Sequence, residues 1–199
     1  MPCAVTKVYV NSLSIFILLE SFSQVINEAI PLSAWIALSI SGVLLVVSGF
    51  MSSSEVAFFS LSPSDIDLIK EEEHPADRGL VELLKDSERL LATILIGNNL
   101  VNVAIVILTG YAFAQIFDFT TAPALGFIFQ TVILTLLLLL FGEIIPKVYA
   151  QARPLSFSRF SAGKMAIASR LLYPFSSFLM RSTSLLTSRM QPKRYDLSV

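Results

Sequence analysis

Three uncharged stretches decide which class of fold this sequence can adopt. They cover residues 29–54, 90–117 and 119–142, and none contains an acidic or basic side chain. A helix needs about 20 mainly apolar residues to cross the hydrocarbon core of a bilayer, so each stretch is long enough. Apolar residues make up 54% of the chain and charged residues 15%, unlike an ordinary soluble domain. The sequence therefore predicts an all-α membrane protein with three transmembrane helices.

The remaining segments are arranged around these spans. We expect residues 31–152 to form the transmembrane domain, and residues 1–30 to form a non-spanning segment that lies outside or at the interface. A cleaved signal peptide is the alternative for that segment. In residues 153–190, apolar side chains recur at helical spacing among Arg and Lys, which predicts an amphipathic juxtamembrane helical region. Residues 191–199 are expected to begin a linker.

Two features of the polar segments sharpen this organisation. The charged connection between the first two spans predicts two short helices broken around His74 and Pro75, the first of them capped by Ser62 with Pro63 at its first position. In the juxtamembrane region, a fourth span would have to bury Lys164 and Arg170, which is costly in lipid. We therefore expect a helix that lies along the membrane surface or packs under the bundle.

The distribution of charge predicts the orientation. Residues 147–194 contain nine Lys and Arg and no acidic residue, although the whole chain has a net charge of -1. Basic residues are enriched on the cytoplasmic side of membrane proteins, so the end of the third span is expected to be cytoplasmic. Three spans then place the N-terminus outside. The expected location is a bacterial inner (plasma) membrane.

Other function classes find little support in the residues. The single cysteine, Cys3, excludes an internal disulfide and a Cys-rich metal site. The single histidine, His74, lies in the charged connection, where a solvated loop residue is the simpler interpretation. The basic residues are not interleaved with a stacking platform, so nucleic-acid binding is not expected. The spans contain no hydrolase motif, and we expect no enzyme activity.

Polar residues recur within the first two spans. Ser48 and Ser52 are four residues apart and share a helix face, and Glu55 lies three residues further along that face. Asn98 and Asn102 have the same spacing in the second span. Hydroxyl and amide oxygens can bind a hard cation. Close helix packing by small residues, or an interhelical hydrogen bond, explains the same residues equally simply.

The third span ends in Gly142, Glu143, Pro146 and Lys147. A carboxylate in such apolar surroundings is costly unless it faces protein, water or a cation. Gly142 and Pro146 loosen the helical hydrogen-bond ladder, so a helix kink is expected at Pro146 and backbone carbonyls become available as ligands. The alternative for Glu143 is an ion pair with Lys147, four residues later.

Topology brings the three polar clusters to a similar depth, because each lies in the inner half of its span. Together they offer hydroxyl, amide and carboxylate oxygens and a backbone carbonyl. This all-oxygen set suits Mg²⁺, Ca²⁺ or Na⁺ and suits zinc poorly. The residues therefore predict a cation site within the helix bundle.

Residues 48–61, 93–102 and 141–147 also resemble, in sequence, order and spacing, the transmembrane domain of the CorC/cyclin-M (CNNM) magnesium transporters. The resemblance covers roughly residues 33–190. Within that family the chain is most similar to a bacterial branch described as gliding-motility-associated.

The resemblance implies a homodimer with an inward-facing cavity that exports Mg²⁺, driven by Na⁺ entry. ATP would be bound only by cytoplasmic CBS domains, which these residues do not contain, so we expect the chain to be part of a longer protein. A non-transporting scaffold or ion sensor of an envelope or gliding-motility complex is the alternative function. The family's cation site maps onto Ser48, Ser52, Asn98, the carbonyl of Gly142 and Glu143, with Asn102 and Glu55 as possible secondary ligands.

Overall fold

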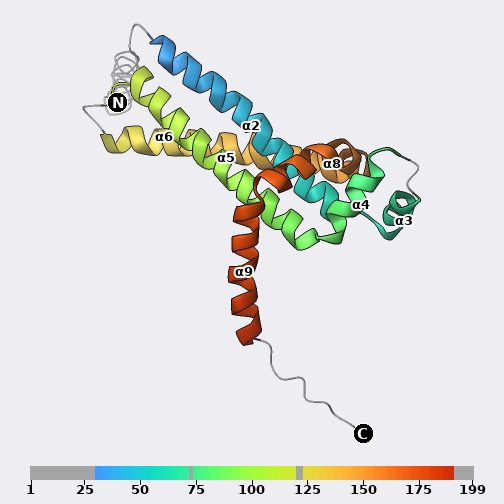
Figure 1. The fold of residues 1–199 in the computed structure, drawn as a ribbon. Coiled ribbons are helices and arrows are strands. Elements are labelled where there is room, and N and C mark those ends of the chain that lie inside the picture. The colour runs from blue at the N-terminus through green and yellow to red at the C-terminus, as the bar shows by residue number, and fades with distance from the viewer. Residues whose placement is uncertain (1–29, 72–73, 120–122, 191–199) are drawn as a thin grey trace, which may run out of the picture. The chain divides into compact units, whose positions relative to one another are not determined.

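The computed structural model describes residues 30–71, 74–119 and 123–190, and it describes side chains as far as Arg181. The regular elements in these ranges are all helical (Figure 1). The predicted all-α class is therefore confirmed. The expected N-terminal segment and the expected linker fall outside the described residues, apart from Ile30.

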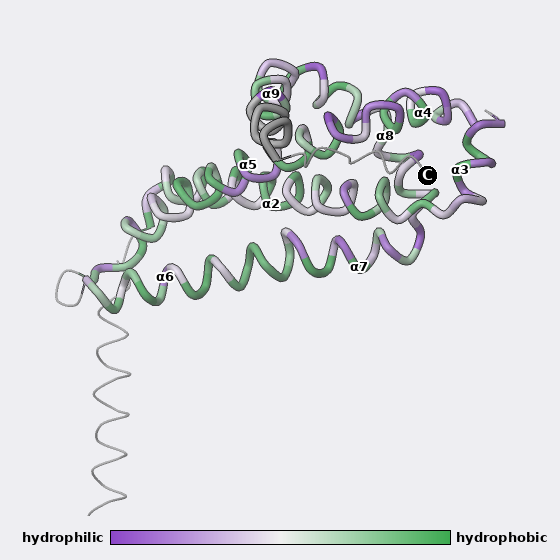
Figure 2. Tube along the Cα trace, turned by 90° about the horizontal axis from the view of Figure 1, so that it is seen from below, coloured by the Kyte–Doolittle hydropathy of each residue, from purple (hydrophilic) through white to green (hydrophobic). Residues whose placement is uncertain are grey.

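Three long helical segments correspond to the predicted spans. They are α2 (Leu32–Phe59), α5 (Ser87–Ile116) and a third segment, Pro123–Ala152. They contain 28, 30 and 30 residues, and each is long and apolar enough to cross a membrane. Figure 2 shows that hydrophobic residues are frequent along α5 and the start of the third span, and hydrophilic residues along the connection that follows α2. The three predicted transmembrane helices are thus confirmed.

The third span is divided into three parts. It consists of α6 (Pro123–Leu137), the π-helix η1 (Leu138–Ile144) and α7 (Ile145–Ala152). Pro123 is the first residue of α6. Its fixed φ angle and missing N–H suit that position.

Burial along the spans is the reverse of that in a soluble protein. Large apolar side chains such as Val46, Ile107 and Phe127 are exposed, whereas the hydroxyl residues Ser48 and Thr93 are fully buried. Lipid solvates apolar side chains as well as a protein core does, and membrane helices pack through small and polar residues. The outer surface of these helices is therefore suited to lipid.

The contacts divide the chain into two compact units. The first is formed by residues up to Leu44 together with residues 103–138, and the second by residues 45–102 and from Leu139 onward. The first unit is held by small residues and aromatic rings. Ala34, Ala37 and Ala112 are buried there, and the Ser33 hydroxyl donates to Gln115 Oε1 at 2.8 Å. The rings that pack with one another in this unit are those of Phe113, Phe117, Phe119 and Phe129.

In the second unit, the charged connection forms the two short helices that were predicted, α3 (Pro63–Lys70) and α4 (Asp77–Lys85). Ser62 caps α3 as expected: the Asp65 backbone N–H donates to its hydroxyl oxygen at 3.2 Å. The Ser62 hydroxyl and backbone N–H donate in turn to Asp65 Oδ2, at 2.7 and 2.9 Å. These hydrogen bonds hold the pKa of the Asp65 carboxyl below its usual value.

The juxtamembrane region also belongs to the second unit and forms two helices. These are α8 (Pro154–Leu171) and α9 (Tyr173–Met190), with Pro174 in the first turn of α9. The apolar core that α8 helps to form contains residues from α2, α3, α4 and α5 as well. Its buried members are Phe58, Ile69, Leu80, Leu90, Ile94, Ala162 and Met165.

One ion pair joins α8 to α4 within this core. The Arg159 guanidinium donates to both carboxylate oxygens of Asp77, at 2.8 and 2.9 Å, and the Asp77 side chain is fully buried. The backbone N–H of His74 donates to the same carboxylate at 3.1 Å. The hydrogen bonds from Arg159 are the main reason that the pKa of Asp77 is lowered, against the opposing effect of burial.

We predict that Asp77→Asn lowers the free energy of unfolding by about 2 kcal/mol, measured by equilibrium unfolding in detergent. Removing one partner of a fully buried ion pair costs about 3–5 kcal/mol. We expect a smaller loss here because Arg159 is partly exposed and solvent screens its charge. The native pKa is lowered, so the contribution is complete above the ordinary carboxyl pKa of about 4. It is lost as the pH falls through the native pKa.

Asp67→Asn is the matched control, since Asp67 forms an exposed pair with Lys70 at 3.5 Å. Its effect should be less than about 1 kcal/mol. Equal effects of the two substitutions would contradict the role given to this pair. So would an Asp77→Asn variant that loses as much stability at low pH as the wild-type chain does.

Candidate cation site

Ser48 lies where residues of α2, α5 and η1 meet in the second unit. Its hydroxyl oxygen is 2.9 Å from Asn98 Oδ1 and 2.7 Å from Asn102 Oδ1, and the side chain is fully buried. A hydroxyl has a single proton, so it can donate fully to only one of the two amide oxygens. The Ser48 hydroxyl oxygen and the two amide oxygens therefore lie close together with one hydroxyl proton between them. A cation would stabilise this arrangement because it attracts all three oxygens.

Gly142 brings the third span against the same hydroxyl. A Cβ built on Gly142 would lie 3.1 Å from Ser48 Oγ and 3.6 Å from Leu45 Cδ1. Glycine therefore permits a close approach that a larger residue would hinder. The structure thus places three of the sequence-predicted residues, together with Asn102, around one point.

Ser52 is one helical turn further along the same face of α2. Its side chain is fully buried, and its hydroxyl oxygen has no hydrogen-bond partner in the part of the chain that the structure describes. A buried hydroxyl without a partner costs about 1–3 kcal/mol. A bound ligand would remove that cost.

The backbone of the third span departs from α-helical geometry at this level. The π-helix η1 contains both Gly142 and Glu143, and it ends directly before Ile145 and Pro146. Pro146 has no N–H, so the Gly142 carbonyl lacks its usual α-helical donor. π-Helical turns occur mainly as single insertions in α-helices, often at functional sites. The loosened ladder expected near Gly142 and Pro146 is present in this form.

Glu143 is half-buried in η1. No hydrogen bond or ion pair to its carboxylate is found within the described ranges. The alternative partner that the sequence offered, Lys147, instead pairs with Glu55, with Nζ and Oε2 3.2 Å apart. Glu143 is therefore available to a cation, whereas Glu55 is already neutralised by an ammonium group.

Other side chains that could bind a metal do not take part in the described contacts around Ser48. Asn99 is exposed and donates to the Leu95 carbonyl of its own helix at 2.8 Å. Among the described residues there is no group of three or more His, Cys, Asp or Glu side chains that could hold a metal. The oxygens that converge at Ser48 are thus neutral, and Glu143, the residue after Gly142 in η1, has a carboxylate with no partner among the described residues. Oxygen ligands of these kinds suit a hard cation.

Sequence reasoning did not single out Gly49 and Ser53, which join α2 to the third span. The Ser53 hydroxyl donates to the Pro146 carbonyl at 2.9 Å. A Cβ on Gly49 would lie 3.0 Å from Pro146 Cγ and 3.1 Å from the Phe141 carbonyl oxygen. Two small residues four apart are a known signal for close helix packing, and Gly49 and Ser53 have this spacing.

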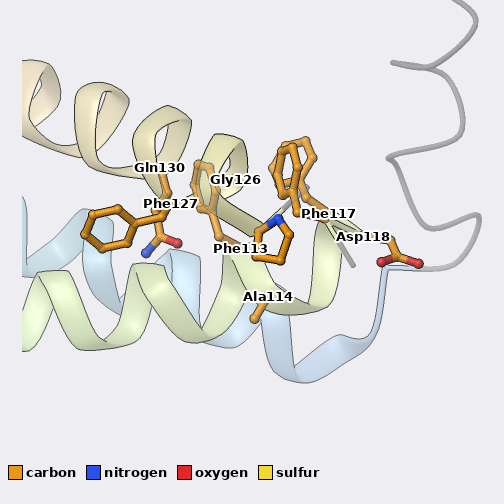
Figure 3. Close-up of a pocket in the computed structure, with 9 residues that line it drawn as sticks. Phe113, Ala114, Phe117, Asp118, Gly126, Phe127 and Gln130 are labelled. Atoms are coloured by element: carbon orange, nitrogen blue, oxygen red, sulfur yellow. The ribbon is translucent and has the colours of Figure 1, made fainter. Parts of the chain in front are cut away.

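A pocket of about 490 Å³ lies in the first unit and contains none of the candidate ligands. Figure 3 shows that α5 and α6 both contribute to it, and four of its nine lining residues are phenylalanines. Such a lining suits an apolar occupant better than a dehydrated cation. Its lining residues are Phe113, Ala114, Phe117, Asp118, Phe119, Pro123, Gly126, Phe127 and Gln130.

We predict that Gly49→Ala destabilises the protein by about 1–3 kcal/mol, because the added methyl group overlaps both the Pro146 ring and a backbone carbonyl. Thermal unfolding in detergent measures the effect. Gly42→Ala is the control on the same helix: a Cβ there meets nothing within 4 Å, and alanine favours the helix. Equal melting temperatures for the two variants would contradict the close approach at Gly49.

Comparison with known proteins supplies relatives of this chain. It is 30% identical over 147 residues to a UPF0053 protein of Haemophilus influenzae, covering 74% of this chain and 33% of that protein. It is 35% identical over 147 residues to the metal transporter cnnm-4 of Caenorhabditis elegans, covering 70% and 27%. It is 26% identical over 153 residues to the UPF0053 inner membrane protein YfjD of Escherichia coli, covering 77% and 34%.

The chain therefore spans about a third of the length of these curated relatives. The family profile described as the cyclin M transmembrane N-terminal domain matches residues 39–196, which include most of α2 and all of α5, the third span, α8 and α9. This chain accordingly belongs to the cyclin M (CNNM) transmembrane domain family.

Proposed function

We propose that this chain is the membrane domain of a divalent-cation transporter whose cargo is Mg²⁺. Membership of the CNNM family and likeness to a protein named as a metal transporter support a transport function. The observation that carries the proposal is the convergence of oxygens: two amide oxygens lie within hydrogen-bond distance of the Ser48 hydroxyl, which has one proton, and the buried Ser52 hydroxyl has no partner among the described residues.

The proposed ligands are Ser48, Ser52, Asn98, the Gly142 carbonyl and Glu143. With the Asn102 amide oxygen the set reaches six, the number that octahedral Mg²⁺ requires. The two serines, the two asparagines and Gly142 supply oxygen dipoles that replace water, and Glu143 supplies the negative charge.

The charge of the site is also suited to transport. One carboxylate leaves a bound divalent cation incompletely neutralised, and affinity for such ions rises with the number of charged ligands. A transported ion must be bound well enough to enter and weakly enough to leave. Because Glu55 is held by Lys147, we assign it a secondary role at the site.

We further propose that transport is Mg²⁺ efflux driven by Na⁺ entry, and that two copies of the chain form a homodimer. The acid-free basic stretch at residues 147–194 supports a cytoplasmic C-terminus and an outside N-terminus. The likeness to a protein named as an inner membrane protein supports that location. Regulation by ATP would require cytoplasmic CBS domains beyond these residues.

The test is Mg²⁺ flux through the purified chain reconstituted in liposomes with a Mg²⁺-sensitive dye. We predict that Glu143→Gln lowers the flux at least about tenfold, because it removes the charge that offsets the desolvation of Mg²⁺. Glu82→Gln in α4 removes the same charge from an exposed position and should leave the flux unchanged. Imposing a Na⁺ gradient in either direction tests the coupling.

Normal flux in Glu143→Gln would overturn the ligand assignment. Mg²⁺ binding to the wild-type chain without any flux would overturn the transport function and favour the ion sensor or scaffold. A Mg²⁺ flux that does not change with the Na⁺ gradient would overturn only the proposed coupling to Na⁺.

A further inference from the structure

Helix α8 has two faces with different surroundings. Ser158 and Met165 are fully buried on the face that packs into the second unit. On the opposite side, Phe160, Ile167 and Leu171 are 61, 68 and 76% exposed. Their spacing of seven and four residues places them in one stripe along the helix. Three large apolar side chains in a row are too exposed for a helix surrounded by water alone.

Lys164 lies within this stripe, one turn after Phe160. Its ammonium nitrogen is 3.4 Å from the centre of the Phe160 ring and 5.1 Å from the centre of the Phe50 ring. These cation–π contacts hold the charge against apolar groups. In the described part of the chain no carboxylate pairs with Lys164, and residues 147–194 contain no acidic residue at all.

The depth of the stripe follows from α2. Phe50 contacts both Phe157 and Phe160 of α8, at ring distances of 6.0 and 6.2 Å. Glu55 is five residues further along α2, about 7.5 Å along the axis, and its pair with Lys147 is more than a third exposed. The stripe therefore lies close to the level at which charged side chains reach water, which is the headgroup region of a bilayer.

We propose that the stripe formed by Phe160, Lys164, Ile167 and Leu171 binds anionic phospholipid. The three apolar side chains enter the boundary of the acyl chains. The Lys164 ammonium, with the exposed guanidinium of Arg170, binds the lipid phosphate. This inference does not depend on the proposed cation site.

The charge of the stripe favours an anionic lipid over a second copy of the chain as the molecule that covers it. A two-fold contact through this stripe would bring Lys164 and Arg170 of one copy close to those of the other. Residues 147–194 contain no acidic side chain that could offset these charges, so they would repel one another. An anionic lipid surface instead attracts each basic residue near it by about 1 kcal/mol.

The experiment measures lipid binding to the purified full chain by native mass spectrometry from detergent, with phosphatidylglycerol and phosphatidylcholine as probes. The wild-type chain should retain phosphatidylglycerol more tightly. Lys164→Gln should weaken that binding about fivefold, and Lys164→Gln with Arg170→Gln about 25-fold, in line with the attraction per basic residue. Lys164→Arg should preserve it.

Lys70→Gln is the matched control, because Lys70 is an exposed lysine of α3 that pairs with Asp67. It should leave lipid retention unchanged. Ile167→Ser should weaken both lipids alike, and unchanged melting temperatures exclude loss of folding as the cause. Equal retention of the two lipids by the wild-type chain, or equal losses in Lys164→Gln and Lys70→Gln, would overturn the proposal. A change in oligomeric state without a change in lipid retention would assign the stripe to a contact between copies.

Discussion

Water is excluded from the hydrocarbon core of a bilayer, so a polar group there must find its partner within the protein or on a ligand. Most spanning residues of this chain meet that demand by being apolar and facing outward. Around Ser48 the protein meets that demand only in part: two amide oxygens converge on one hydroxyl proton, and the nearby Ser52 hydroxyl lacks a partner among the described residues. The π-helix η1 and the close approach of Gly142 to Ser48 lie at the same place in the fold.

Helix α2 uses two neighbouring faces for two tasks. Gly49 and Ser53 pack closely against the third span, through the Phe141 carbonyl and Pro146. Ser48 and Ser52 lie one residue earlier on the helix and form the candidate site. Close packing, one of the explanations that the sequence offered for the small residues, is therefore provided by Gly49 and Ser53, and Ser48 and Ser52 remain as ligands of the proposed cation site. The rigid packing face holds the polar face in register.

The region outside the spans supports this arrangement by a different kind of bonding. The α8 helix is fixed to α4 by the Asp77–Arg159 pair and to α2 by the ring contacts of Phe50. One face of α8 is therefore buried against the rest of the second unit, while the opposite stripe remains exposed. That division places a basic, apolar surface on the same unit as the candidate site.

The sequence by itself determined the three spans, the all-α class and the capped start of α3, because each depends on neighbours in the chain: an uncharged run, or Ser62 followed by Pro63 and Asp65. It also identified the polar residues that share a helix face. Only the tertiary structure decided that Lys147 pairs with Glu55 and leaves Glu143 available, and that Ser52 is enclosed without a partner. Helical periodicity fixes which side chains lie together on one helix, but the rotation of each helix against its neighbours depends on packing across the bundle.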